Sequence, residues 1–189
     1  VTINGGEINL TQSYEALESA VITINDGILH LIASDDGVNA GGGADGSSVN
    51  DRPGQNAFAA GNYFVYINGG YLYVDANGDG LDTNGSFEMT GGVVIVNGPT
   101  NNGNGPLDYM GTFNVYGGLL VAVGSSGMPQ APSASSSQYS ILYNFTSALP
   151  AGTMIHIETA DGQEVLTFVP TKSYQSLVFS SPTLQNGTD

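Results

Sequence analysis

Apolar and polar residues alternate on both sides of a Gly-Gly or Asp-Gly pair at five places along this chain. The five segments span residues 1–10, 22–31, 65–74, 87–96 and 113–122. Counted from the second glycine, the positions five and three residues before it and two and four residues after it are apolar in every copy. Alternation with a period of two is typical of strands that bury one face, so each copy predicts two short strands joined at a glycine corner.

The copies recur at a nearly constant spacing of about two dozen residues. Their second glycines are Gly6, Gly27, Gly70, Gly92 and Gly118. The single double-length interval becomes an ordinary one if the Gly-, Asn- and Ser-rich stretch 41–62 is an inserted loop. One copy cannot bury its apolar face alone, whereas a stack of copies can. We therefore predict an all-β fold, a right-handed parallel β-helix (solenoid), with a Greek-key β-sandwich as the alternative.

Two columns of apolar residues should line the interior of this stack. The columns are Ile3, Ile24, Ile67, Met89, Val115 and Ile8, Leu29, Leu72, Val94, Leu120. The outward positions are mixed in the early copies but become apolar in the last two copies. These apolar outward residues are Val93, Ile95, Leu119 and Val121. A patch of this kind needs a cover.

The last third of the chain departs from the repeat and supplies a candidate cover. Asp161-Gly162 lies between two alternating segments and is a strong hairpin signal. We expect a C-terminal antiparallel β-hairpin region to pack against the solenoid and protect its open end. Residues 1–189 then form a single domain, with solenoid coils in 1–128, a linker in 129–137 and the C-terminal β segment in 138–189. We expect a monomer.

Composition excludes several classes of function. Two Lys or Arg against 17 Asp or Glu give a formal net charge of -15, which repels nucleic-acid phosphates and anionic membrane surfaces. The absence of Cys excludes disulfides and thiolate metal sites, and no apolar run is long enough to span a bilayer. We expect no nucleic-acid partner and no membrane insertion. The chain opens without a charged, apolar leader, as a processed or excised fragment would. We expect an extracellular or cell-surface location on a bacterium.

Carboxylates recur at matching offsets beyond the strand pairs. The aligned residues are Glu15, Asp36 and Asp79 at nine residues after the glycine, then Glu18, Asn39 and Asp82 at twelve, with Asp108 at the equivalent place in the fourth copy. Stacked coils lie ~4.8 Å apart, and two unit charges near 5 Å repel by roughly 3 kcal/mol at an effective dielectric of 20. Calcium removes that repulsion and binds six to eight oxygen ligands. The sequence therefore predicts a calcium-binding ladder.

The segment 75–80, Asp-Ala-Asn-Gly-Asp-Gly, also reproduces the first half of an EF-hand loop. It adds Asp75 and Asn77 to the candidate calcium ligands, although Ser86 stands where the bidentate Glu of that motif would be. The alternative is that these Asp-Gly and Asn-Gly pairs only form turns.

Residues suited to catalysis are few. Neither His30 nor His156 can be placed beside a nucleophile, and a calcium-dependent polysaccharide lyase acting on polyuronates would need Lys172 or Arg52 as its base.

Tyrosine offers a flat apolar face on which a sugar ring can stack. The candidate glycan-binding residues are Tyr71, Tyr73 and Tyr109.

Several turn motifs carry a family resemblance when taken in order. They are Asp-Asp-Gly-Val-Asn-Ala at 35–40, Gly-Asp-Gly-Leu-Asp-Thr-Asn-Gly at 78–85, Gly-Pro at 98–99, Gly-Pro-Leu-Asp-Tyr at 105–109, Ser-Ser-Gly-Met at 125–128 and Pro-Thr-Lys-Ser-Tyr at 170–174. With these motifs the chain resembles, over nearly its whole length, the bacterial carbohydrate-binding domain family typified by a clostridial cellulose- and pectin-binding surface protein.

The resemblance implies a calcium-binding right-handed parallel β-helix, similar in fold to polysaccharide lyases, that binds cellulose-like and acidic or pectic polysaccharides without evident cleavage. On the matching motifs it implies that Asp35, Asp36, Asn39, Asp79 and Asp82 are calcium ligands. Glu15, Glu18 and Asp108 rest on the stacking argument, and a role for Asp45 or Asp51 in the inserted stretch stays open. We therefore expect an extracellular, non-catalytic, calcium-binding polysaccharide-binding module. The alternatives are a polyuronate lyase and a structural or adhesive surface domain.

Overall fold

The chain is described by a computed structural model covering residues 1–41 and 61–186. Most of the predicted inserted loop 41–62 lies outside the described residues, as do Asp45, Asp51 and Arg52. The described part of the chain is all-β and contains no helix, as the alternation predicts. Accordingly, none of the described residues belongs to a helix long and apolar enough to cross a membrane.

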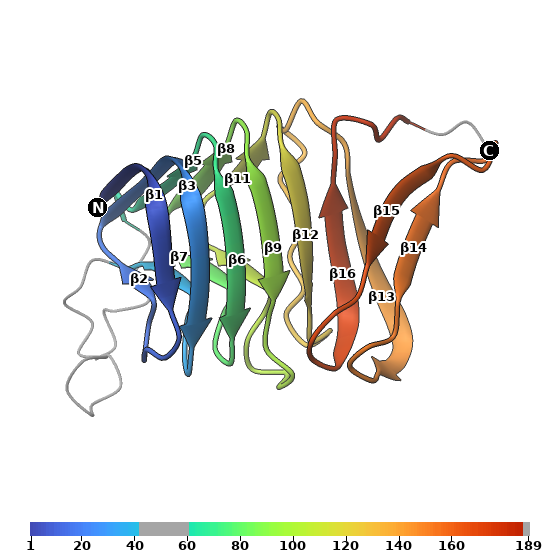
Figure 1. Ribbon diagram of the computed structural model, residues 1–189, viewed down its shortest axis with the longest axis horizontal. Coiled ribbons are helices and arrows are strands. Elements are labelled where there is room, and N and C mark those ends of the chain that lie inside the picture. The colour runs from blue at the N-terminus through green and yellow to red at the C-terminus, as the bar shows by residue number, and fades with distance from the viewer. Residues whose placement is uncertain (42–60, 187–189) are drawn as a thin grey trace.

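Within residues 1–41 and 61–186, sixteen strands form three sheets. Figure 1 shows their arrangement. The strands are β1 (Thr2–Leu10), β2 (Leu17–Glu18), β3 (Val21–Ala33), β4 (Val38–Ala40), β5 (Phe64–Ile67), β6 (Tyr71–Ala76), β7 (Leu81–Thr83), β8 (Ser86–Met89), β9 (Val93–Asn97), β10 (Leu107–Tyr109), β11 (Phe113–Val115), β12 (Leu119–Gly124), β13 (Ser140–Leu149), β14 (Ile155–Glu158), β15 (Glu164–Phe168) and β16 (Tyr174–Ser180). The largest is a curled, mixed ten-stranded sheet in the order β11-β8-β5-β3-β6-β9-β12-β16-β13, with β1 also paired to β3. The parallel four-stranded sheet runs β10-β7-β4-β2, and β14 pairs with β15.

The glycine corners are where the strand pairs of each copy change direction. All five second glycines have positive φ, between 78° and 122°, a conformation that costs other residues strain. A Cβ at Gly70 would also lie 2.7 Å from the carbonyl oxygen of Gly27 in the preceding copy. The corners therefore need glycine both for their backbone conformation and for the close approach of neighbouring copies.

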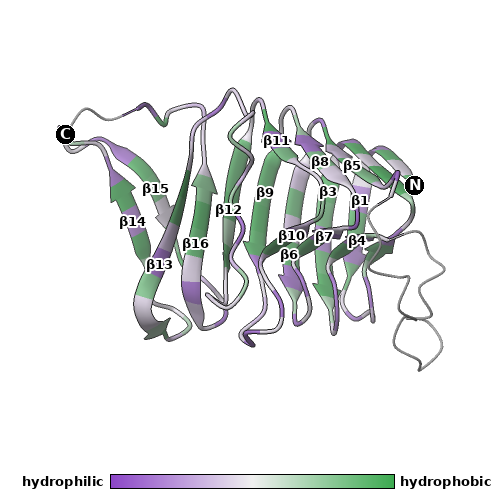
Figure 2. Ribbon diagram, turned by 180° about the vertical axis from the view of Figure 1, so that it is seen from behind, coloured by the Kyte–Doolittle hydropathy of each residue, from purple (hydrophilic) through white to green (hydrophobic). Residues whose placement is uncertain are grey.

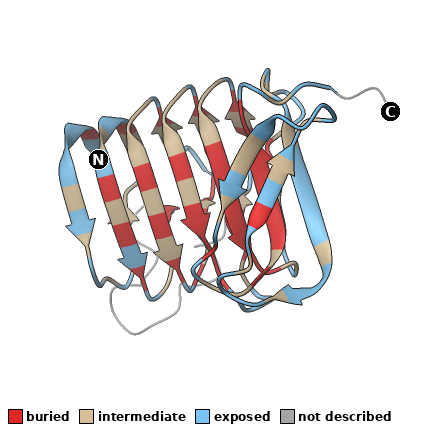
Figure 3. Cartoon of the chain, turned by 45° about the vertical axis from the view of Figure 1, so that its right-hand side comes forward, coloured by how far each residue is buried: buried red, intermediate tan, exposed pale blue. Residues whose placement is uncertain are grey.

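Strand β3 shows how one copy connects to the next. Its first half, up to Ile24, pairs in parallel with β5, and its second half, from Ile28, pairs in parallel with β6. Both predicted apolar columns stand in register across consecutive parallel strands, from Ile3 to Val115 and from Ile8 to Leu120. These columns face a common core with residues of the four-stranded sheet. Alternation of buried and less buried positions along the strands is visible in Figure 3.

An asparagine ladder follows the same stack at the corners. The side-chain amide of Asn25 donates to Asn4 Oδ1 at 2.7 Å, that of Asn68 donates to Asn25 Oδ1 at 2.8 Å, and Thr90 Oγ1 donates to Asn68 Oδ1 at 2.9 Å. Each of these hydrogen bonds joins one copy to the next. A shift of the strand pairing by one residue would break them.

The C-terminal region covers part of the apolar outward patch. Strand β16 pairs antiparallel with β12 and with β13, and the β14–β15 hairpin packs over them. Val121 is buried in a second core cluster with Ile155 and Phe179. Leu119 packs against this cluster, whereas Val93 and Ile95 remain half-exposed. Among the described strands, β13 pairs with β16 alone and so forms an edge of the large sheet.

The segment predicted as a linker, 129–137, extends the stack instead of leaving it. Ser133 donates its backbone N–H to Phe113 O at 2.7 Å, and its hydroxyl oxygen accepts the N–H of Phe113 at 2.9 Å. Ser136 Oγ accepts the N–H of Val115 at 3.0 Å. The two serine hydroxyls thus accept hydrogen bonds from backbone N–H groups of β11, on the edge where no regular strand pairs with it.

Candidate metal centre

The predicted acidic residues converge along the four-stranded sheet. Glu18 lies opposite Asn39, Asn39 opposite Asp82, and Asp82 opposite Asp108 in the pairings of β2, β4, β7 and β10. We call this set, together with Glu15, Asp35, Asp36 and Asp79 from the turns before the strands, the acidic column. The intervening apolar residues Leu17, Val38, Leu81 and Leu107 pair in the same order and point into the core.

The turns before the strands are joined through their aspartates. Asp36 Oδ1 accepts the backbone N–H of Asp79 at 2.6 Å, and Asp79 Oδ1 accepts that of Gly105 at 2.5 Å. Each carboxylate thus bridges to the next copy with one oxygen.

Three carboxylates come close enough to share one ion. One oxygen from each of Asp79, Asp82 and Asp108 lies within 4.8 Å of the other two. Oxygens at this spacing can bind a hard cation together, whereas without a cation their charges repel.

Burial and mutual repulsion both raise the pKa values of these aspartates. Burial, the larger cause, and then repulsion by Asp82, Asp79 and Asp35 raise the pKa of Asp36 to about 9. Burial, followed by repulsion from Asp79, Asp108 and Glu15, raises the pKa of Asp82 to about 8.

The pKa values of Asp79 and Asp108 are raised as well. Burial raises the pKa of Asp79 to about 7, although the hydrogen bond from Gly105 opposes this shift. Burial also raises the pKa of Asp108, against the hydrogen bonds from Tyr109 N–H and Gln130. Among the described residues, the hydrogen bonds to Asp36, Asp79, Asp82 and Asp108 come from backbone N–H groups and from Gln130, and none comes from Lys172.

Two further observations indicate that the donor set fits a hard cation. Asn39 is 5% exposed, and its Oδ1 is buried without a hydrogen-bond partner among the described residues. An oxygen of this kind is a suitable cation ligand and is costly to leave unsatisfied. At Gly78, a Cβ would overlap Oδ1 of both Asp35 and Asp36, so the absence of a side chain there lets the two carboxylates approach. Carboxylate and amide oxygens without His or Cys favour calcium over zinc.

Asp35 occupies the margin of the column. Its carboxylate accepts a hydrogen bond from the Tyr14 hydroxyl, and this contact with the negative charge of Asp35 raises the pKa of Tyr14 to about 12. Tyr14 therefore stays a neutral donor.

Asp75 and Asn77, the other predicted ligands, lie outside the acidic column and contact the ammonium of Lys172. Lys172 Nζ lies 3.0 Å from Asp75 Oδ1 and 3.3 Å from Asn77 Oδ1. The half EF-hand motif therefore divides, with Asp79 in the acidic column and the two earlier residues around a lysine.

Gln130 contacts the acidic column, although the sequence did not predict it there. Gln130 Nε2 donates to Asp108 Oδ1 at 3.0 Å, and its Oε1 accepts the N–H of Tyr109 at 3.0 Å. Gln130 comes from the segment 129–137, which has no apolar alternation to align it with the copies. Its one signal is its spacing from Asp108, which equals an ordinary interval of the repeat.

The candidate glycan-binding tyrosines separate into two places. Tyr71 and Tyr73 of β6 lie either side of His30 of β3 with ring centroids 5.7 Å away in each case. We call these three residues the aromatic strip. It is flanked on β3 by Ile28 and Ile32, which are 48% and 43% exposed. Figure 2 shows β3 and β6 of the large sheet, coloured by hydropathy. Tyr109 belongs to the other sheet, where its hydroxyl donates to Ala131 O at 2.6 Å.

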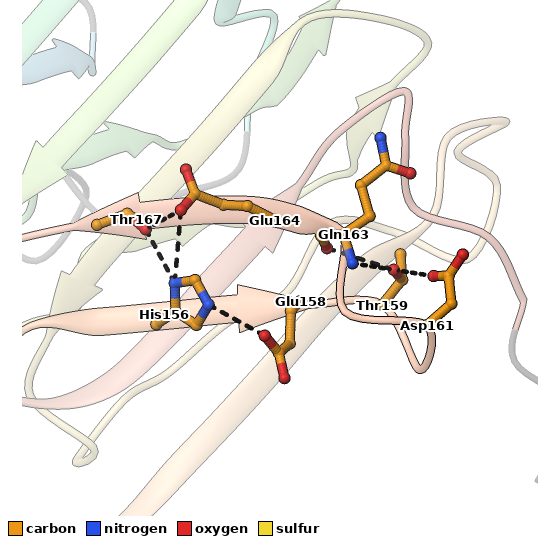
Figure 4. Close-up of polar contacts among 7 residues, drawn as sticks. All are labelled: His156, Glu158, Thr159, Asp161, Gln163, Glu164 and Thr167. Carbon is orange, nitrogen blue, oxygen red and sulfur yellow. Dashed lines mark hydrogen bonds and ion pairs between the residues drawn. The ribbon is translucent and has the colours of Figure 1, made fainter.

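The second histidine lies in a polar network on the β14–β15 hairpin (Figure 4). One ring nitrogen of His156 contacts Thr167 Oγ1 at 2.9 Å, and the other contacts Glu158 Oε2 at 3.4 Å. The turn follows the Asp-Gly prediction, with Gly162 at φ 84° and Gln163 N–H donating to Thr159 Oγ1 at 3.0 Å. These exposed contacts stabilise the hairpin, and Thr167 Oγ1 also donates to Glu164 Oε2 at 2.9 Å.

Comparisons of the chain with protein-family models, with curated proteins and with solved structures found no match. The family resemblance stays a prediction, and the acidic column and aromatic strip must be argued from their own geometry.

Proposed function

We propose that this chain is a right-handed parallel β-helix that binds calcium at its acidic column and acts as a non-catalytic, extracellular polysaccharide-binding module. The observation that carries the calcium assignment is the convergence of Asp79, Asp82 and Asp108 on one point with Asn39 Oδ1 unsatisfied beside Asp82. In-register parallel pairing over successive copies supports the coil, and parallel crossovers are right-handed in nearly all proteins.

Calcium's role here is chiefly structural. Its charge offsets the repulsion among carboxylates that the fold brings together, so bound calcium should stabilise the folded state by mass action. Wild-type protein should contain calcium by elemental analysis and melt at a lower temperature after treatment with a chelator. Absence of bound calcium together with an unchanged melting temperature would reject the assignment.

Polysaccharide binding rests on the family resemblance and the aromatic strip. Tyr71 and Tyr73 present rings on an outer face that also exposes Ile28 and Ile32, and such surfaces stack on the apolar faces of sugar rings. Affinity electrophoresis with cellulose-like and pectic polysaccharides, in calcium, tests this part. Tyr71→Ala and Tyr73→Ala should weaken retention, whereas Tyr116→Ala, at an exposed tyrosine outside the strip, should not. Equal retention of all three variants would exclude the strip as the binding surface.

A polyuronate lyase is the second candidate, and the placement of Lys172 argues against it. Its ammonium is bound by Asp75 and Asn77 and contacts none of the three converging aspartates, so it is badly placed to abstract a proton beside a metal held there. Ultraviolet absorbance from unsaturated uronate products, formed by wild type and lost in Lys172→Met, would establish the lyase and overturn the non-catalytic assignment.

A further inference from the structure

Lys172 lies in an enclosure of oxygen atoms on the stacked strands. It belongs to the segment between β15 and β16, yet its Nζ reaches Asp75 Oδ1 at 3.0 Å and the backbone oxygen of Ala76. Asn77 Oδ1 at 3.3 Å and the backbone oxygen of Asn97 at 3.5 Å complete the enclosure. The lysine side chain is only 18% exposed. An ammonium has three donors, and this site offers it four acceptors.

The chemistry of these oxygens is that of a hard-cation site. One carboxylate, one side-chain amide and two backbone carbonyls are the ligand types that calcium takes in proteins. They come from neighbouring strands and the turn after them, since Asp75 of β6 lies opposite Asn97 of β9. The ammonium of Lys172 already occupies this enclosure, which shows that a cation fits among the four oxygens.

The segment that carries Lys172 is held at both sides of it. Thr171 donates its backbone N–H to Asn97 Oδ1 at 3.0 Å, and Thr171 Oγ1 lies 3.4 Å from the Tyr73 hydroxyl. Tyr174 is 2% exposed and its hydroxyl donates to Thr153 O at 3.1 Å. These contacts fix the backbone, so the ammonium is directed into the enclosure by its own loop.

We propose that Asp75, Asn77 and the carbonyls of Ala76 and Asn97 form a second cation-binding site, which the chain fills with the ammonium of Lys172. The lysine is a tethered counter-ion that attaches the C-terminal segment to the stack without a metal. When the ammonium is removed, the same oxygens accept a divalent metal ion in its place. The inference is independent of the metal assignment at the acidic column, which uses other residues.

The test replaces the ammonium and keeps the apolar stem. In Lys172→Met, amide hydrogen exchange in 169–180 should accelerate in chelator because Asp75 has lost its counter-charge. Millimolar calcium should slow that exchange again by binding at the enclosure. In the wild type, calcium should slow exchange in this segment no more than it slows exchange in β3, which reports stabilisation through the acidic column, since the ammonium excludes the metal from the enclosure.

The double variant Lys172→Met, Asp75→Asn is the matched control. Without the carboxylate, calcium should slow exchange in 169–180 no more than it does in the wild type. Because exchange is followed locally, failure of calcium to bind the acidic column would leave this comparison intact. Two results overturn the proposal: unchanged exchange in Lys172→Met, or an acceleration that calcium fails to reverse or reverses equally in the double variant.

Discussion

Asp82 lies directly opposite Asp108 in the parallel pairing of β7 with β10, so two acidic side chains occupy neighbouring positions on the same face. Asp79 completes the group from the preceding turn. Like charges placed opposite one another destabilise a sheet, and a stable fold that keeps three of them needs a compensating cation or a proton.

Asp82→Asn should change stability in opposite directions with and without metal. In chelator the variant loses a repulsive charge and should melt higher. In calcium it loses a ligand and should melt lower. Each change should be about 1 kcal/mol or more, or at least roughly 2–4 °C for a chain of this size. Glu7→Gln removes the same charge from an exposed position of β1 and should shift both melting curves alike. A parallel shift for Asp82→Asn would contradict a metal at this point.

The metal-free protein should be more stable in mildly acidic than in alkaline solution. The folded-state pKa values of Asp36, Asp82 and Asp79 are raised from 3.8 to about 9, 8 and 7. Between about pH 4 and pH 9 the folded state therefore binds more protons than the unfolded state, and stability falls as the pH rises. Urea unfolding in chelator at several pH values measures this slope.

Calcium should flatten or reverse that slope, because the metal binds the ionised carboxylates and its affinity increases with pH. Chelated protein whose stability rises between pH 5 and pH 8 would show that the carboxylates do not carry raised pKa values.

Gly78→Ala should disturb the acidic column without altering its charge. The added methyl group would overlap the carboxylates of Asp35 and Asp36 and the backbone of Asp35. Forcing a methyl group into packed surroundings typically costs 1–3 kcal/mol, and calcium affinity should fall with it. Gly103→Ala is the control, since the nearest atom to its Cβ would be Asn101 Oδ1 at 3.4 Å. Isothermal titration with calcium compares the two, and equal affinities would exclude a role for the Gly78 approach.

Asn68→Ala should weaken the cohesion between copies. It removes the bond from Asn68 to Asn25 Oδ1 and the one from Thr90, and the net cost of two partly solvated hydrogen bonds is about 1–2 kcal/mol. The exposed Asn9 on β1 provides a comparison, because its change to alanine should cost less. Chemical unfolding of the two variants gives the difference.

The repeat made most of the parallel strand pairing predictable from sequence. Alternation around Gly27 and Gly70 placed two apolar columns, and the matching offsets of Asn39, Asp82 and Asp108 placed three side chains that the structure brings into register. These predictions succeeded because each residue pairs with its equivalent one copy later, so spacing along the chain fixes position in space.

Contacts between unlike segments could not be read in this way. Nothing in the spacing of Lys172 links it to Asp75, almost a hundred residues earlier, because the C-terminal segment lies outside the repeat. Gln130 was missed for a related reason, since its segment satisfies the last copy through side-chain hydrogen bonds instead of alternating strands. The predicted C-terminal cover does bury Val121, but it leaves Ile95 partly exposed. How far the cover reaches depends on the size of the hairpin, which the repeat does not specify.

The position of β13 at the sheet edge has a consequence for how the protein behaves in concentrated solution. The strand carries no charged side chain, and Tyr143 and Ile141 are 55% and 37% exposed. Uncharged, exposed edge strands pair readily with other chains. What opposes such pairing is the net charge of -15 on the molecule as a whole, which vanishes near the isoelectric point of about 4.1. Colloidal stability should accordingly collapse close to that pH and on screening by salt, with β13 as the strand through which molecules first join.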